Sequence, residues 1–203
     1  MSHPDPDGPA ALTPIEVGEV WTNPVTGDRA TFLELPSMNP DGRCSSELTV
    51  HVGGAGGEHR HPTVVERFTV LEGELTVKVD GQTSVLGKGE TATVDAGVWH
   101  ESWNAGARDA QIRVELTPGG RMIHMLETMW GLARLGHTND EGMPDRLQLA
   151  LIAREFSDVL VFRSPPLAVQ RALFAALAPI ARGRGYRATY PELSRSALAS
   201  PAD

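Results

Sequence analysis

The spacing of apolar residues changes near residue 118, which divides the chain into two differently patterned parts. Before that point apolar and polar residues alternate in short runs broken by glycine, a pattern typical of β-strands with one buried face. The pattern predicts strands at residues 46–52, 64–71, 75–79, 91–94 and 98–103, and a strand–turn–strand unit at 15–35. The dipeptide Asp80-Gly81 predicts a hairpin turn after the strand at 75–79. Residues 15–117 are therefore predicted to form a mainly β domain.

After residue 118 the apolar residues recur at intervals of three and four, the period of an amphipathic helix. The predicted helices cover residues 122–136, residues 144–156, and a third segment that stops at residue 183 or 185. This third helix is predicted to start after Ser164-Pro165, with Ser164 as its cap and the proline in its first turn. We expect this α-helical C-terminal extension, residues 118–203, to pack on the β domain or to form a dimer interface. Its methionine-rich stripe could instead line a substrate entrance, because methionine adapts to irregular apolar shapes. Packing is the favoured interpretation.

Composition narrows the classes of function. The 203 residues include 26 acidic and 18 basic ones, a net charge of −8, which argues against a nucleic-acid-binding surface. The apolar stretch at residues 172–181 is too short to cross a bilayer, which needs roughly 20 residues. Cys44 is the single cysteine, so an internal disulfide is excluded. A chain without disulfides is compatible with a reducing compartment. Residues 1–14 are predicted to be a disordered N-terminal tail rather than a secretory signal, so a cytoplasmic location is expected.

Three histidines and one glutamate are candidate metal ligands: His59, His61, Glu66 and His100. In a strand, side chains two positions apart point to the same side, so His59 and His61 can contact one ion together. Imidazole and carboxylate donors suit iron, manganese, nickel, copper or zinc. Four protein ligands on a five- or six-coordinate ion leave room for water, dioxygen or substrate.

The order and spacing of these residues resemble the two motifs of the cupin family. The first motif contains two glycines, His-x-His and a glutamate, and is matched by Gly53, His59, His61, Glu66 and Gly73. The second motif is matched by Gly89, Gly97, His100 and Asn104, with Asp95 where the family usually has proline. Aspartate is also a good turn former, so this departure should leave the bend intact. The resemblance covers residues 15–117. Within the family, the chain is most similar to small bacterial members with a single barrel.

The resemblance implies a double-stranded β-helix, a jelly-roll-like barrel that holds one divalent metal ion, Fe, Mn, Ni, Cu or Zn, on His59, His61, Glu66 and His100. The activity that it favours is that of a mononuclear metal dioxygenase or related oxidoreductase, similar to quercetin dioxygenase, with a small aromatic or enolic substrate. Glu66 would be both a ligand and the catalytic base that takes the substrate hydroxyl proton, if its apolar surroundings raise its basicity.

Two other functions remain open, because the cupin fold hosts many activities. The ion could act as a Lewis acid in a non-redox isomerase, cyclase or lyase, for which zinc or manganese would be sufficient. The protein could instead be a metal-stabilised small-molecule binding protein without turnover. We expect a small-molecule substrate, no nucleic-acid or membrane partner, and a homodimer, since barrels with exposed edge strands often pair.

Other conspicuous residues are interpreted as structural. His51 is expected to face solvent or to make a hydrogen bond, and His124 and His137 are assigned no ligand role. The glycine-rich run at 53–57 is interpreted as a loop beside the site rather than a phosphate cradle, because no helix start follows it.

The remaining polar and aromatic residues near the second motif also have structural interpretations. Trp99 and Trp103 alternate with His100, so both should face away from the metal. Asn104 is expected to stabilise a turn through its amide, and Cys44 to be buried and inert.

Overall fold

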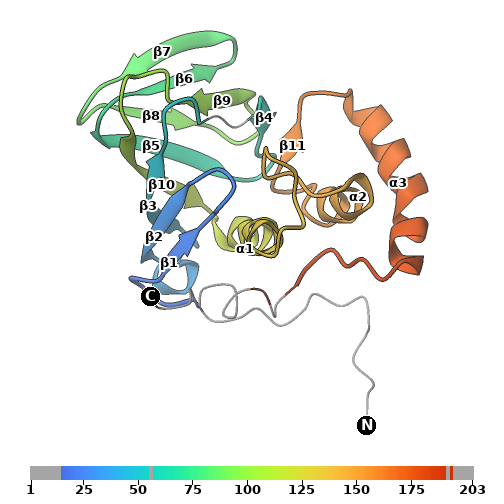
Figure 1. The fold of residues 1–203 in the computed structure, drawn as a ribbon. Helices are drawn as coiled ribbons and strands as arrows, with labels where there is room; N and C mark the ends of the chain where they lie inside the picture. Colours follow the sequence, from blue (N-terminus) through green and yellow to red (C-terminus); the bar gives the residue numbers. More distant parts are fainter. Residues whose placement is uncertain (1–14, 55–56, 191–192, 194–203) are drawn as a thin grey trace.

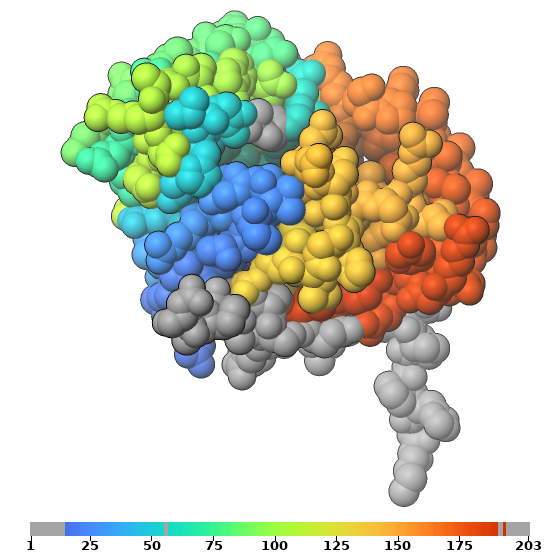
Figure 2. Space-filling model, viewed as in Figure 1, coloured from blue at the N-terminus to red at the C-terminus, as the bar shows by residue number. Residues whose placement is uncertain are grey.

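The computed structural model describes residues 15–54, 57–190 and 193, and Figure 1 shows a β-barrel with helices along one side. The predicted disordered tail at residues 1–14 lies outside these described residues, as do residues 55–56 of the glycine-rich run. The space-filling view in Figure 2 shows the helical part packed along the barrel on this face. The fold is mainly β with helices toward the C-terminus, as predicted.

Two antiparallel sheets form the barrel. The six-stranded sheet has the order β1 (Val20–Thr22), β2 (Arg29–Glu34), β3 (Cys44–Val50), β10 (Ala110–Thr117), β5 (Val65–Glu72) and β8 (Thr91–Val94). The five-stranded sheet has the order β11 (Val161–Phe162), β4 (His59–Arg60), β9 (His100–Trp103), β6 (Leu75–Val79) and β7 (Gln82–Leu86). A short 3-10 helix, η1 (Pro36–Met38), joins β2 to β3.

Alternation along the strands separates the barrel interior from solvent. In β5, Glu66, Phe68 and Val70 are buried while Arg67 is exposed. The same alternation continues through all eight residues of β10, which pairs with β3 on one side and β5 on the other. Because side chains of a strand alternate between faces, this pattern directs one row of each strand into the core. It also directs Glu66 into the barrel interior.

The hairpin predicted after residue 79 is confirmed. Strands β6 and β7 pair with Val79 opposite Gln82, so Asp80 and Gly81 form a two-residue turn. Both residues have positive φ values, 47° and 81°, as the favoured turn of a twisted hairpin requires. Asparagine, aspartate and glycine tolerate this conformation, which explains the dipeptide found here.

One predicted strand is displaced, and strands β10 and β11 were not predicted. The strand expected at 46–52 lies two residues earlier, at Cys44–Val50. Its first residue, Cys44, pairs with Leu116 near the end of β10. Strand β11 was not predicted, since a helical extension was expected throughout 118–203. Its two residues, Val161 and Phe162, pair with β4 and so extend the five-stranded sheet. A two-residue strand leaves no alternation in the sequence to detect.

Three helices follow the barrel: α1 (Gly120–Arg134), α2 (Arg146–Glu155) and α3 (Leu167–Gly183). The Asp145 side chain accepts hydrogen bonds from the N–H groups of Leu147 and Gln148 and thereby caps α2. The prediction that Ser164 caps α3 is wrong, because the helix begins at Leu167 with Pro166 at the N-cap position and without a side-chain cap. Among the described residues no helix is long and apolar enough to cross a membrane.

The main hydrophobic core joins the barrel to the helices. Phe68, Val70 and Ile112 of the barrel belong to one buried cluster with Met122 of α1 and Phe156 at the end of α2. The predicted packing of the extension on the barrel is therefore confirmed for α1 and α2. Helix α3 contributes instead to a separate small cluster around Leu151, Ala178 and Ala181.

Cys44 is buried beside Glu34, as predicted for an inert thiol. Desolvation and the Glu34 carboxylate raise the pKa of Cys44 to about 12. The reactive species of cysteine is the thiolate, so native protein is expected to resist labelling. A thiol-reactive dye at pH 8 should label the protein only after unfolding by urea; rapid labelling of the native state would contradict this prediction.

Candidate metal centre

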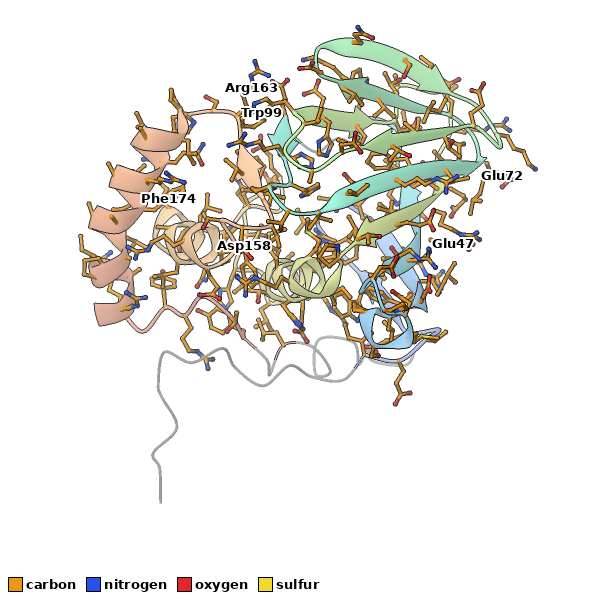
Figure 3. The ribbon with its side chains drawn as sticks, turned by 180° about the vertical axis from the view of Figure 1, so that it is seen from behind. Glu47, Glu72, Trp99, Asp158, Arg163 and Phe174 are labelled. Atoms are coloured by element: carbon orange, nitrogen blue, oxygen red, sulfur yellow. The ribbon has the colours of Figure 1, made fainter. Side chains whose placement is uncertain are left out.

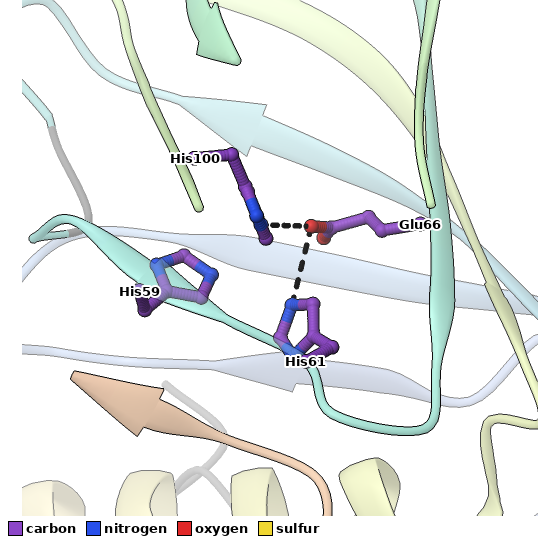
Figure 4. A group of neighbouring side chains, drawn as sticks. All are labelled: His59, His61, Glu66 and His100. Atoms are coloured by element: carbon purple, nitrogen blue, oxygen red, sulfur yellow. Dashed lines mark hydrogen bonds and ion pairs between the residues drawn. The ribbon is translucent and has the colours of Figure 1, made fainter. Parts of the chain in front are cut away.

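Four side chains from both sheets converge inside the barrel, as Figure 4 shows. Glu66 comes from β5 of the six-stranded sheet, whereas His59 and His100 face each other across the β4–β9 pair of the other sheet. His61 follows directly after β4. One potential ligand atom from each residue lies within 4.8 Å of the others, so the group could hold one metal ion. All four candidate ligands predicted from the sequence are thus brought together.

Backbone carbonyls hold all three imidazole rings through Nδ1. His59 Nδ1 lies 2.7 Å from the Gly57 carbonyl oxygen, and His100 Nδ1 lies 3.0 Å from that of Val98. His61 Nδ1 lies 2.7 Å from the carbonyl oxygen of Val159. An N–H on Nδ1 that donates to a carbonyl leaves Nε2 as the ligand nitrogen, and the same contact fixes the ring orientation.

The Glu66 carboxylate contacts two of the three imidazole rings. Its Oε2 lies 2.9 Å from His100 Nε2 and 3.3 Å from His61 Nε2. Desolvation alone would raise the pKa of Glu66, but the hydrogen bonds from His100 and His61 and the nearby imidazoles lower it to about 2. The expectation that apolar surroundings raise its basicity is therefore wrong, because the imidazoles outweigh the effect of burial.

The histidines differ in their readiness to carry a proton. Desolvation lowers the pKa of His59 to about 4, and the neighbouring His100 adds to this effect. For His100 desolvation acts in the same direction, yet the hydrogen bond to Glu66 prevails and the pKa is raised. A proton on His100 therefore compensates the negative charge of the buried Glu66 carboxylate. A bound cation would compensate the same charge.

The chemistry of this donor set fits a divalent metal ion. Three imidazole nitrogens and one carboxylate oxygen match the preferences of Zn, Fe, Mn, Ni and Cu. A buried carboxylate needs a compensating charge, and three rings already oriented by carbonyls present their second nitrogen toward it. His59, His61, Glu66 and His100 would hold the ion, with their orientation set before it binds.

A segment of the helical extension completes the environment of His61. Besides the Val159 carbonyl, the Asp158 carbonyl accepts a hydrogen bond of 2.8 Å from the Thr63 hydroxyl. Immediately beyond, β11 pairs with β4, and Phe162 lies opposite His59. The Phe162 and His59 rings are 6.4 Å apart. Sequence reasoning missed this contribution, because a backbone carbonyl nearly one hundred residues away from its histidine has no signature in the sequence.

Asn104, the last residue of the second motif, is structural as predicted. Its side-chain N–H₂ donates to the carbonyls of Val50 and Arg108, and its Oδ1 accepts from the Gly106 N–H, all at 2.9 Å. The residue is completely buried. It therefore ties the end of β9 to the end of β3.

Replacing Asn104 by alanine is expected to lower the free energy of unfolding by about 2–3 kcal/mol, because one buried and two partly buried hydrogen bonds to the backbone are lost. Urea denaturation would measure the loss. The half-buried Gln111, whose amide bonds only the Thr49 hydroxyl, provides a control, and Gln111→Ala should cost much less. Equal losses for the two variants would contradict the assignment.

The other singled-out histidines lie apart from the group. His51 bonds the Asp109 carboxylate and the Gly27 carbonyl, at 2.8 and 2.7 Å, which confirms the hydrogen-bonded alternative. The His124 ring lies 3.8 Å from the Glu127 carboxylate within α1, and His137 is exposed after that helix. Trp99 stacks with the guanidinium groups of two arginines on the side away from the metal centre, as its strand position predicts.

Comparison with known proteins gives a family match for the barrel segment. Residues 46–120 match the family model described as Cupin domain. Germin-like protein subfamily T member 2 of Arabidopsis thaliana is 30% identical over 95 residues, which are 44% of this chain and 43% of that protein. The chain thus spans less than half the length of the curated relative it matches.

Solved structures to which the chain is similar share less of its sequence. A predicted oxalate decarboxylase from Thermotoga maritima is 21% identical, with 49% of this chain and 90% of that chain covered and a TM-score of 0.43. An RmlC-like cupin from Shewanella frigidimarina is also 21% identical, with 53% and 89% covered and a TM-score of 0.43.

The matched segment contains all four candidate ligands. Residues 46–120 of this chain therefore match the Cupin domain model and carry a His-His-Glu-His group that could hold one metal ion.

Proposed function

We propose that the protein is a mononuclear metal-dependent dioxygenase or related oxidoreductase that acts on a small aromatic or enolic substrate. The observation that carries the proposal is the ligand group itself: three imidazoles, each held by a backbone carbonyl, around one buried carboxylate. A complete ligand set with four protein donors on a five- or six-coordinate ion leaves positions for exogenous molecules. Such a site suits chemistry better than a purely structural role.

The three histidines and Glu66 would have different roles in this reaction. His59, His61 and His100 orient their Nε2 atoms, and the buried interior limits access of water. When bound, a redox-active divalent ion supplies Lewis acidity and electron transfer. We propose that Glu66 also accepts the substrate hydroxyl proton at a carboxylate oxygen. A pKa of about 2 makes it a weak base in the ion-free protein, so only a hydroxyl whose acidity a bound ion increases, such as that of an enol or a phenol, would give its proton to Glu66.

Oxygen uptake tests this proposal directly. Protein loaded separately with iron, manganese, nickel, copper or zinc is mixed with catechols, flavonols and 1,3-diketones in an oxygen electrode. The proposal expects substrate-dependent oxygen consumption with at least one redox-active ion and none with zinc. His51→Gln, which changes a histidine outside the group, should retain the activity, whereas His59→Gln should lose it.

Other results would assign the site to a different class. Turnover that is supported equally by zinc and proceeds without oxygen would indicate non-redox isomerase or lyase chemistry. Tight binding of a compound that is never converted would indicate a binding protein. Either result contradicts the dioxygenase proposal.

We further propose that the protein works as a cytoplasmic homodimer. Support comes from α3, which presents Val169, Leu173 and Ile180 with about half of each side chain exposed. These residues are four and seven positions apart and so lie along one helix face. Light scattering at micromolar concentration should give twice the chain mass, and Leu173→Glu should shift the mass toward the monomer. A monomeric unmodified protein would contradict the dimer.

A further inference from the structure

A cavity of about 520 Å³ lies behind the metal centre, between the β4–β11 pair and the three helices. Arg60 and Pro62 form part of its wall, and they alternate with His59 and His61 along the chain. Because consecutive side chains of an extended segment point to opposite sides, Arg60 and Pro62 reach the cavity from the side of β4 away from the ligand group. Phe162, whose ring lies 6.4 Å from that of His59, borders the cavity as well. Its volume falls within the range of roughly 300–1,000 Å³ for small-molecule sites.

The walls of this cavity are largely apolar. Met125 and Met129 line it from α1, Ile152 from α2, and Phe174 from α3. Figure 3 shows Phe174 on the side of α3 that faces α2. Met122 packs in the core, as expected for the methionines of the extension. Met125 and Met129 also border the cavity. Two flexible thioethers and an aromatic ring suit an apolar ligand of irregular shape.

The charged residues of the cavity all have one sign. Arg60, Arg154 and Arg171 line it, and no aspartate or glutamate does, although the chain carries a net charge of −8. Within the described part of the chain, none of the three arginines forms an ion pair with a carboxylate. Other arginines nearby are paired: Arg121 with Asp158, and Arg163 with Glu58.

Arg60 shows the clearest lack of a partner. Its guanidinium carbon lies 4.9 Å from the centre of the Trp99 ring, and its Nε is buried without a hydrogen-bond acceptor. A buried N–H of a charged group without an acceptor is costly, which indicates that an acceptor is supplied from outside the chain. A carboxylate beside Arg60 would supply it, and Arg154 and Arg171 add positive charge to the wall of the same cavity.

We propose that this cavity is a binding site for an organic carboxylate with an apolar body, separate from the metal centre. The aliphatic or aromatic body contacts Met125, Met129, Ile152 and Phe174, and the carboxylate lies toward the arginines. Such a ligand satisfies both the apolar wall and the unpaired charges, whereas a neutral compound leaves the arginines unpaired. The site does not depend on which reaction the metal centre performs.

Octanoate and octanamide provide a matched pair of probes, because they differ mainly in charge. Each is titrated against full-length, metal-loaded protein in complex with the fluorescent sulfonate 1-anilinonaphthalene-8-sulfonate, and displacement is measured. Charge-assisted hydrogen bonds contribute about 1.5–3 kcal/mol, so octanoate should bind roughly tenfold or more tightly than octanamide. Equal affinities, or no displacement by octanoate, would overturn the proposal.

Two pairs of variants locate the site. The double variant Arg154→Gln/Arg171→Gln should lose most of the preference for octanoate, whereas Arg182→Gln, which removes one charge elsewhere on α3, should retain it. Ala175→Trp fills the cavity and should block both probes, and Ala176→Trp, one position along the helix, should not. All five positions are exposed, so folding should survive and can be checked by circular dichroism. Octanoate bound at the metal ion would be insensitive to all these changes, and that result would refute a separate site.

Discussion

Replacing Glu66 by glutamine is expected to weaken the affinity of the protein for a divalent ion by more than about 100-fold. Changes in residues that only support metal ligands already cost about 10–100-fold, and Glu66 is the sole carboxylate of the group. Glutamine preserves the shape of the side chain, so the barrel should still fold. Titration calorimetry with zinc would measure the change.

Thermal unfolding offers an independent readout of the same prediction. Ion at 100 times its dissociation constant stabilises a folded protein by about 2.7 kcal/mol, which raises Tm by roughly 5–10 °C for a chain of this size. Glu66→Gln and His59→Gln should lose this increase, whereas His51→Gln should keep it. If zinc stabilised the unmodified protein and both site variants equally, the four residues would not be the ligands.

Strand periodicity accounts for the part of this site that could be predicted from the sequence. His59 and His61 point to one side because they are two positions apart in an extended segment, and Glu66 faces inward with Phe68. That His100 lies opposite His59 follows from the register of β4 and β9, which local patterns do not specify. The family resemblance supplied that step.

The electrostatics of the site could not be predicted in the same way. The sequence places Glu66 among apolar residues, and from this alone burial is expected to dominate its pKa. In the structure, the imidazoles of His61 and His100 contact its carboxylate and reverse the direction of the shift. Distances between charged groups decide such a balance, and these distances exist only after the two sheets have come together.

The role of the helical extension was the least predictable feature. A helix period in the sequence correctly indicated α1 and α2 and their apolar faces. It could not indicate that the chain between α2 and α3 returns to the barrel as β11, or that the Val159 carbonyl contacts His61. These contacts use backbone atoms, which every residue type provides.

The connection between the extension and the metal centre can be tested at Phe156. This side chain is buried in the main core, and the Phe156 carbonyl accepts hydrogen bonds from the N–H groups of Val159 and Leu160. Phe156→Ala is expected to lower the free energy of unfolding by about 3–5 kcal/mol. The loosened turn should also release the Val159 carbonyl from His61 and weaken zinc affinity by about tenfold or more.

Leu151 separates this effect from a general loss of stability. It is equally buried in α2 but packs against Ala178 and Ala181 of α3 rather than against the barrel. Leu151→Ala should cost about 2–5 kcal/mol in unfolding free energy and leave zinc affinity nearly unchanged, because the Val159 turn keeps its anchor. Urea denaturation and zinc titration of both variants would decide the matter. If the two substitutions weakened zinc binding alike, the Val159 carbonyl would have no specific part in orienting His61, and the extension would support the metal centre only through overall stability.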